Sequence, residues 1–167
     1  NFAGRFWKSG DLGAVDEDGF VRVLDRKKDM INRAGYKIYS AEVENVLAHL
    51  PGVVESAVVA KPCPVLGERV HVFVLADRPE IDAEKVRSFC AERLADYKVP
   101  ESVTFVREPL PRNANGKVVK TELRRLLAES LAADTGIPVH SADPLRANAP
   151  GDWLVAMAES ISDCLKK

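Results

Sequence analysis

Residues 9–38 read SGDLGAVDEDGFVRVLDRKKDMINRAGYKI, and this stretch decides how the chain is organised. Two runs that favour β-strands, 12–16 and 20–24, flank an acidic Asp-Gly turn, which is typical of a β-hairpin. Five consecutive charged residues, 25–29, then separate the hairpin from the glycine-bearing turn 32–35. A purely structural hairpin does not need so dense a charge cluster. The stretch therefore predicts an element that holds a nucleotide and can move.

Length and composition exclude several classes of protein. At 167 residues the chain fits one domain, or one small domain with an appendage. Its net charge of −1 gives no basic field that would recruit nucleic acid or an anionic membrane. The apolar runs are too short to cross a bilayer. Three cysteines without a CxxC or Cys/His pattern favour a reducing, cytoplasmic location. Because the chain begins with Asn, we expect a fragment or a processed product.

Downstream of the opening stretch, helical and strand-like patterns alternate. Valine-rich runs predict strands, and apolar residues at helical spacing follow polar residues of the type that caps helices. The pattern predicts an α+β fold, with a small β-hairpin followed by a compact domain in which helices pack on a roughly three-stranded sheet. The predicted core strands are 53–60, 70–76 and 103–106, and the predicted helix N-caps are Ser40, Asp82 and Thr121.

The C-terminal part of the sequence has a different character. Residues 132–151 are rich in Pro, Asp, Asn and Ala without periodicity, which predicts a linker or a loosely packed extension. An amphipathic helix is predicted over 152–165. Its apolar face is suited to docking a partner or a second copy of the chain.

Asp11, Arg26 and Lys28 are candidate functional residues of the opening stretch. A carboxylate on a tight turn can accept hydrogen bonds from both hydroxyls of a ribose, although an Asp beside Gly more often binds its own backbone. Arg26 can donate to ribose or phosphate oxygens, whereas charge runs are usually solvated surfaces. Lys28 lies where the chain changes direction, as a hinge residue does.

Two turns add further candidates. Gly35 allows the backbone to approach a ligand closely, but the sequence around it is neither a GxGxxG motif nor a P-loop. Lys117 follows the turn-rich stretch 111–116 and is predicted at a loop tip. There its ammonium group can neutralise charge that develops on a carboxylate or α-phosphate. A solvated turn lysine is the alternative. The three histidines lack partners at ligand spacing, so no metal site is predicted.

Three motifs occur in one order along the chain: FWKSGDLG (6–13), LDRKKDMINRAGYKIYSAEVE (24–44) and ADYKVPESVTFVREPLPRNANGKVVKTELR (95–124). Together they resemble the C-terminal region of AMP-forming acyl-CoA synthetases, members of the adenylate-forming (ANL) superfamily. The resemblance covers about residues 4–128. It implies a two-step reaction, in which a carboxylate and ATP give acyl-AMP and pyrophosphate, and the CoA thiol then displaces AMP.

The resemblance also implies roles for the candidates. It assigns ribose binding to Asp11 and Arg26, and the hinge to Lys28, where the family has Asp or Lys. It assigns Lys117 to the lysine that bridges the substrate carboxylate and the α-phosphate during adenylation. A loop that lines the CoA tunnel after rotation of the lid is implied at four residues, Arg33, Ala34, Gly35 and Tyr36.

The implied organisation is a tail of a large N-terminal domain (1–27), a C-terminal AMP-binding lid (28–131) and an unassigned extension (132–167). The large domain, with its phosphate loop and acyl pocket, is absent from the sequence. ATP or AMP, CoA and Mg²⁺ are the implied cofactors, bound mainly through that N-terminal adenylation domain. We therefore expect the isolated chain to be inactive.

Two alternatives remain open. The chain can be the lid of an adenylation domain that loads a carrier protein, although Lys98-Val99-Pro100 and the ending LPRNANGK are more like free-standing CoA ligases. It can also be a non-catalytic interaction module that kept the lid fold. The presence of both Asp11 and Lys117 is an argument against the second alternative.

Overall fold

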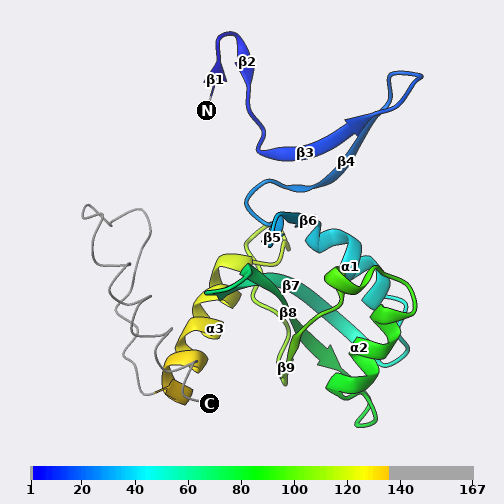
Figure 1. Cartoon of the computed structure of the whole chain (residues 1–167), viewed down its shortest axis with the longest axis vertical. Coiled ribbons are helices and arrows are strands. Elements are labelled where there is room, and N and C mark those ends of the chain that lie inside the picture. The colour runs from blue at the N-terminus through cyan, green and yellow to red at the C-terminus, as the bar shows by residue number, and fades with distance from the viewer. Residues whose placement is uncertain (1, 136–167) are drawn as a thin grey trace.

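A computed structural model of the chain describes residues 2–135, with side chains to residue 132, and Figure 1 shows its arrangement. The two short hairpins β1–β2 and β3–β4 form an arm, residues 2–26, that extends from the rest of the domain. The elements are β1 (Phe2–Ala3), β2 (Phe6–Trp7), β3 (Asp11–Val15), β4 (Val21–Arg26), β5 (Ile31–Arg33), β6 (Tyr36–Ile38), α1 (Ser40–Leu47), β7 (Val53–Cys63), β8 (Gly67–Ala76), α2 (Ala83–Ala91), a 3₁₀ turn (Asp96–Lys98), β9 (Ser102–Val106) and α3 (Lys120–Thr135).

The sheet of the main domain is mixed and, within residues 2–135, has five strands. The long strands β7 and β8 pair antiparallel from Val53↔Ala76 to Cys63↔Gly67. On the other edge of β8, β9 pairs in parallel, and β5 meets β8 at Gly67. The α+β class and the three valine-rich strands are confirmed. The sheet has five strands rather than about three, because β5 and β6, on either side of the turn predicted at 32–35, also belong to it.

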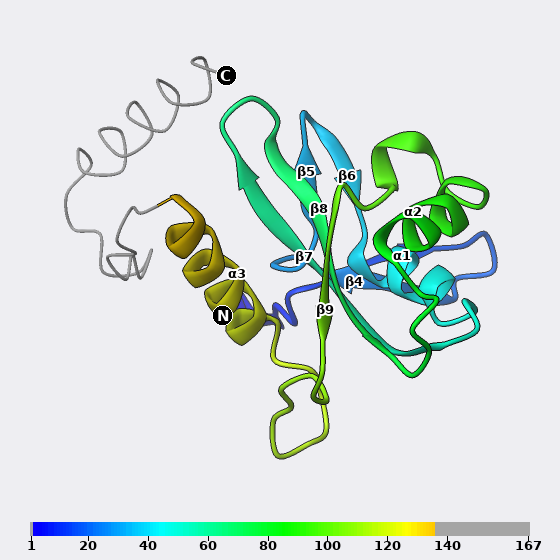
Figure 2. The same ribbon diagram turned by 90° about the horizontal axis from the view of Figure 1, so that it is seen from below.

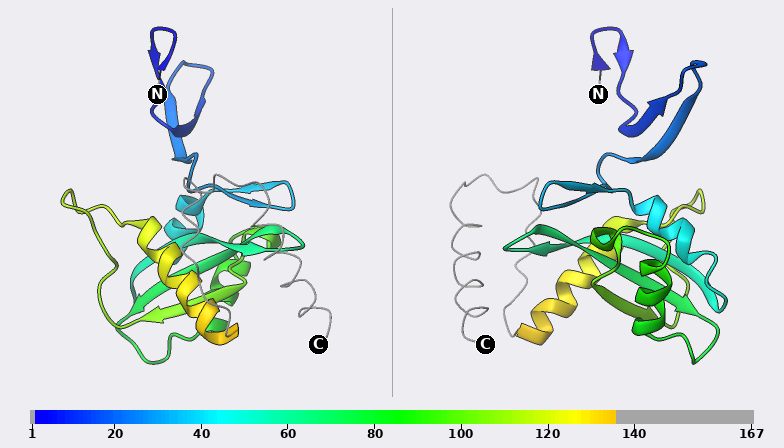
Figure 3. Two further views of the ribbon diagram at one scale, coloured as in Figure 1. Left: turned by 90° about the vertical axis from the view of Figure 1, so that its left-hand side faces the viewer. Right: turned by 45° about the vertical axis from the view of Figure 1, so that its right-hand side comes forward.

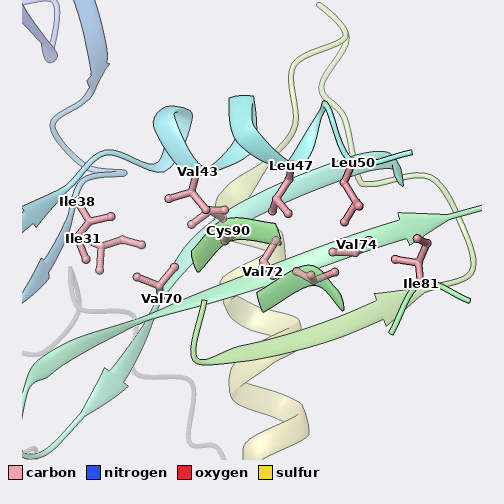
Figure 4. Close-up of a cluster of buried hydrophobic side chains, with 12 residues drawn as sticks. Ile31, Ile38, Val43, Leu47, Leu50, Val70, Val72, Val74, Ile81 and Cys90 are labelled. Atoms are coloured by element: carbon pink, nitrogen blue, oxygen red, sulfur yellow. The ribbon is translucent and has the colours of Figure 1, made fainter. Parts of the chain in front are cut away.

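Helices cover both faces of this sheet, as Figure 2 shows. Alternate residues of β8 point to opposite faces, because side chains alternate along a strand. Val70, Val72 and Val74 pack under α1 and α2 with Val43, Leu47, Val86 and Cys90, and Figure 4 shows part of this cluster. Phe73 and Val59 form a smaller core with Leu123 and Leu127 of α3. These two cores fix the scaffold from which the functional segments extend.

Two of the three predicted helix caps are wrong. Asp82 does cap α2, where its side chain accepts a hydrogen bond from the Lys85 amide. Ser40, however, is the first residue of α1, and the preceding Tyr39 makes no side-chain cap. Thr121 lies inside α3, which starts at Lys120. Contacts from other elements replace the local cap at α1, as described below.

The C-terminal helix extends beyond the predicted boundary at residue 131. It continues to Thr135, and the amphipathic helix predicted over 152–165 lies outside the described residues. Among the helices of residues 2–135, none is both long and apolar enough to span a membrane.

Candidate functional site

Asp11 and Arg26 lie side by side on the arm. They are directly opposed in the β3–β4 register, and Arg26 Nε is 3.3 Å from Asp11 Oδ1. Gly10 has a positive φ of 81°, and its carbonyl accepts a hydrogen bond from the Lys27 amide, so the turn and the end of β4 are joined. Both side chains are partly exposed, at 33% for Asp11 and 53% for Arg26. The pair therefore offers a carboxylate and a guanidinium together to a polyhydroxylated ligand.

Lys28 lies in the tight turn between β4 and β5. The amides of Asp29 and Met30 both donate to the Arg26 carbonyl, which forms the turn. Arg124 of α3 holds the following residues, because one guanidinium nitrogen donates to the Lys28 carbonyl at 3.2 Å and to Asp29 Oδ1 at 2.8 Å. The chain from the Lys28 carbonyl onward is thus attached to the main domain, and the Lys28 side chain is exposed.

The predicted tunnel loop forms the tip of the β5–β6 hairpin. Ala34 and Gly35 both have positive φ, 50° and 92°, which is the backbone of a type I′ turn. Asn32 Oδ1 accepts a hydrogen bond from the Gly35 amide at 3.1 Å, and the Ala34 amide donates to the Leu66 carbonyl at 2.8 Å. The residues on either side of the turn, Arg33 and Tyr36, are fixed by the main domain.

Arg33 and Tyr36 are held by residues that follow α2. Glu101 accepts from Arg33 Nε at 2.6 Å and pairs through its other oxygen with Arg69 at 3.0 Å. The ring of Tyr36 stacks on Tyr97, with centroids 4.6 Å apart and planes 25° apart. The hairpin tip therefore has a shape that several distant segments determine.

Lys117 lies at the tip of the loop between β9 and α3, which we call the Lys117 loop (residues 111–118). Asn113 organises it, since its side chain accepts from the amides of Asn115 and Lys117, both at 3.0 Å. Gly116 has a φ of 76°, and its carbonyl accepts from Arg112 at 2.7 Å. Among the hydrogen bonds and ion pairs of residues 2–132, none involves the Lys117 ammonium group, and this residue is exposed.

Arg112 also connects the Lys117 loop to the sheet. Its second terminal nitrogen is 2.9 Å from Glu55 of β7, and Glu55 accepts from the Leu110 amide as well. Desolvation raises the pKa of Glu55, but the hydrogen bonds from Arg112 and from the Leu110 amide outweigh it, so the pKa is lowered overall. Glu55 thus stays ionised as an anchor.

The structure places the predicted CoA-tunnel loop and the Lys117 loop apart. Figures 2 and 3 show the β5–β6 hairpin and the loop between β9 and α3 at opposite sides of the domain. Asp11 and Arg26 are brought together, whereas Lys117 and Gly35 are not. Within residues 2–135, no group of three or more His, Cys, Asp and Glu side chains has the arrangement of a metal site.

The residues that position these segments are not among the predicted site residues. Glu101 and Arg124 bind across 68 and 95 residues of chain, respectively, so no local pattern marks them. Asp25 was noted only as a member of the charge cluster. Its carboxylate oxygen Oδ2 accepts from the Ser40 amide at 2.5 Å and from the Ser40 hydroxyl at 2.9 Å.

Comparisons with known proteins agree with the order of motifs. Residues 42–117 match the family described as the AMP-binding enzyme C-terminal domain. The chain is 41% identical over 123 residues to the long-chain-fatty-acid–CoA ligase FadD13 of Mycobacterium tuberculosis, which covers 74% of the chain and 24% of the ligase. It is 50% identical over 117 residues to a 3-[(3aS,4S,7aS)-7a-methyl-1,5-dioxo-octahydro-1H-inden-4-yl]propanoyl:CoA ligase of Rhodococcus jostii, covering 70% of the chain and 22% of the ligase.

A solved structure is similar over the same region. The o-succinylbenzoate CoA synthetase MenE of Bacillus subtilis, in complex with the acyl-adenylate OSB-AMP, superposes with a TM-score of 0.69 and 38% identity, over 74% of this chain and 25% of that one. Further structures of MenE contain AMP, or ATP and a magnesium ion. The chain thus spans about a quarter of the length of the relatives it matches.

Proposed function

From the premise that this chain belongs to the AMP-binding enzyme C-terminal domain family of ANL-superfamily acyl-CoA ligases, we propose that it is the lid of an ATP-dependent acyl-CoA synthetase. The reaction is the ligation of a carboxylic acid to CoA in two steps. In the first, a carboxylate oxygen attacks the α-phosphorus of ATP, and the bond to pyrophosphate breaks. In the second, the CoA sulfur attacks the acyl carbon, and AMP leaves.

The observation that carries this proposal is the separation of Lys117 from the Gly35 hairpin. Lys117 has an exposed ammonium group on a tight loop, and the Gly35 hairpin lies at the opposite side of the domain. A lid that rotates about Lys28 brings first one and then the other to a fixed nucleotide. Lys117 then neutralises charge on the carboxylate and α-phosphate in the first step. The Gly35 hairpin then lines the path of the CoA thiol in the second step.

Asp11 and Arg26 are proposed to hold the ribose of the nucleotide in both steps. Their mutual contact at 3.3 Å places hydrogen-bond acceptors and donors together, as a pair of vicinal hydroxyls requires. ATP, AMP and CoA are thus ligands of this chain in part. The oxygen-rich ligands that Mg²⁺ needs are proposed to come mainly from the N-terminal domain and from the nucleotide phosphates.

An N-terminal adenylation domain is the proposed partner of the arm. Large apolar side chains on both hairpins of the arm are exposed, and so many of them on a short segment support an interface with another domain. The most exposed are Phe2 (70%), Phe20 (72%) and Val21 (71%), with Phe6, Trp7, Val15 and Val23 close to these values. We also propose a cytoplasmic location, with the free thiols of Cys63 and Cys90 as support.

The test uses the gene product that includes the sequence upstream of Asn1. The longer protein is assayed for pyrophosphate release with ATP, Mg²⁺ and a panel of aliphatic and aromatic carboxylic acids, and the 167-residue chain is assayed in parallel. We expect release only by the longer protein. Turnover by the isolated chain, or no acid-dependent release by the longer protein, would contradict the proposal. CoA and a phosphopantetheinylated carrier protein are then compared as acceptors, and preference for the carrier would reassign the second step.

A further inference from the structure

The Asp25 carboxylate joins two parts of the chain that lie on opposite sides of Lys28. Asp25 belongs to β4 of the arm, whereas Ser40 and Ala41 begin α1 of the main domain. Asp25 Oδ2 accepts from the Ser40 amide (2.5 Å), the Ser40 hydroxyl (2.9 Å) and the Ala41 amide (3.4 Å). Asp25 Oδ1 accepts from the Arg26 amide at 2.7 Å. The carboxylate therefore uses both oxygens and is half-buried.

This contact replaces a missing local cap. The first amides of a helix have no intrahelical acceptor, and a carboxylate near them is also favoured by the helix dipole. Tyr39, at the N-cap position of α1, supplies no side-chain acceptor. Lys120 of α3 completes the cluster, because its ammonium group is 2.6 Å from the Ser40 hydroxyl and 2.7 Å from Glu44. Three elements thus meet at the start of α1.

Asp29, four residues further on, differs from Asp25 because it binds a residue on its own side of Lys28. It lies after Lys28 and is nearly buried, and Arg124 binds it together with the Lys28 carbonyl. All of these groups belong to the main domain and move with it. A rotation at Lys28 therefore leaves the Asp29 contact intact, but it carries Ser40 and Ala41 away from Asp25.

We propose that Asp25 is a positioning residue that latches the lid in the orientation seen here and must release the start of α1 before the lid rotates. This inference rests on the proposed function, because it assumes a rotation about Lys28. It assigns distinct tasks to the two acids of the motif DRKKD. The Asp25 contact exists only in this orientation of the lid. The Asp29 contact keeps the segment after Lys28 attached to the lid in every orientation.

The experiment measures the orientation of the arm directly and needs no substrate. In the 167-residue chain with Cys164→Ser, spin labels are attached at Asp18→Cys on the β3–β4 turn and Glu84→Cys on α2, both exposed positions. The native Cys63 and Cys90 are buried. Electron–electron double resonance then gives the distribution of distances between the labels. We expect one narrow population with Asp25, and a broad distribution in Asp25→Ala.

Matched variants separate the latch from a general loss of structure. Asp16→Ala removes an acid of the same arm that binds only the Phe20 amide, so the narrow distribution should remain. Asp25→Asn keeps a neutral hydrogen-bond acceptor and should give a distance distribution of intermediate width. This variant also tests the latch if Asp25→Ala does not fold. The Ser40 and Ala41 amides should exchange about fivefold faster in Asp25→Ala, the change typical of a lost N-cap.

Two results would overturn the inference. One is a distance distribution in Asp25→Ala that equals that of the parent chain. The other is equal broadening in Asp16→Ala, because the effect would then belong to the arm itself. Neither result depends on ATP, a carboxylic acid or CoA. Failure of the latch is therefore distinguishable from failure of the proposed synthetase activity, which pyrophosphate release measures separately.

Discussion

The β5–β6 hairpin tip and the Lys117 loop are both tight turns with glycines at positive φ, but they are held in different ways. The hairpin tip is fixed by distant residues, with Glu101 bound to Arg33 and Tyr97 stacked on Tyr36. The Lys117 loop is formed mostly by its own residues, through the Asn113 side chain and the Arg112–Gly116 contact.

This difference matches what each region is proposed to do. A wall of a tunnel must keep its shape while a ligand slides along it, and distant contacts provide that rigidity. A charged group that is delivered to a reaction centre needs only a short anchor and an unpaired ammonium group. The comparison predicts that substitutions in the two regions have different consequences.

The largest effect is expected for Lys117→Ala in the longer protein. Loss of the ammonium group should slow acyl-adenylate formation by about 10²- to 10³-fold, the usual effect of removing one group that stabilises the transition state. Thioester formation from a supplied acyl-adenylate should remain within about threefold, because Lys117 has then moved away. Pyrophosphate exchange and CoA consumption measure the two steps. Lys85→Ala on α2 is the control. If Lys117→Ala slowed both steps equally, Lys117 would not act in adenylation alone.

Acidification should lower the stability of the sheet and thereby weaken both regions. The β5–β6 hairpin is paired with β8, and Arg112 of the Lys117 loop binds Glu55 of β7. His71 of β8 is buried, with Nδ1 2.7 Å from the Ser102 hydroxyl and no partner for Nε2 among the described residues. Burial, followed by repulsion from Lys61, lowers the His71 pKa from 6.5 to about 4. The unfolded chain therefore binds the proton more readily below pH 6.5, and stability falls as the pH drops from 6.5 towards 4.

The expected loss is about 2 kcal/mol at pH 5 relative to pH 7.5, from the linkage between protonation and unfolding. Urea unfolding at the two pH values measures it. His71→Gln should be less stable at pH 7.5 but should lose most of this pH dependence. If the loss of stability is the same in parent and variant, other groups cause it.

A matched pair of glycine substitutions compares the two regions directly. At Gly35 and at Gly116 a new Cβ would meet no atom within 4 Å, and φ is positive at both, 92° and 76°. Each alanine therefore costs about 1–2 kcal/mol of backbone strain and nothing from steric contact. We expect Gly35→Ala to lower the free energy of unfolding, measured with urea, by this whole strain energy, since the hairpin is held by Glu101 and Tyr97. Gly116→Ala should lower it by less than half as much, because the Lys117 loop can relax locally.

The smallest effect is expected for Arg112→Ala. The ion pair with Glu55 is partly exposed, and such pairs contribute about 0.2–1 kcal/mol. The free energy of unfolding should change by no more than that, while the amides of Asn115 and Lys117 exchange several-fold faster. Hydrogen exchange measured by NMR tests both statements. An equal increase of exchange in the β5–β6 hairpin would show that the regions are coupled.

Sequence patterns predicted the elements whose defining residues lie close together in the chain. The β3–β4 hairpin, the valine-rich strands, the Asp82 cap and the turn that presents Lys117 are all marked by residues within a few positions of one another. The α+β class followed from their order, and the superfamily from the three motifs. These expectations are confirmed.

The rest depends on contacts between distant residues. The strands β5 and β6 have three residues each and include charged residues, so neither the length nor the alternation identifies them. The cap of α1 was misplaced at Ser40 because the group that fulfils this role, Asp25, comes from 15 residues earlier and from another element. The assignments of Asp11, Arg26, Lys28, Gly35 and Lys117 to steps of a reaction stay predictions.

The parallel pairing of β9 with β8 has a consequence for how the domain folds. The β7–β8 hairpin needs only the short turn between Cys63 and Gly67, so it can form as soon as residues 53–76 are available. β9 can pair in parallel with β8 only when the segment 77–101, which contains α2, crosses over the sheet, so this pairing closes a longer loop. Glu101 and Tyr97 lie in that crossover, so we expect the Gly35 hairpin to gain its final shape only after β9 has paired with β8.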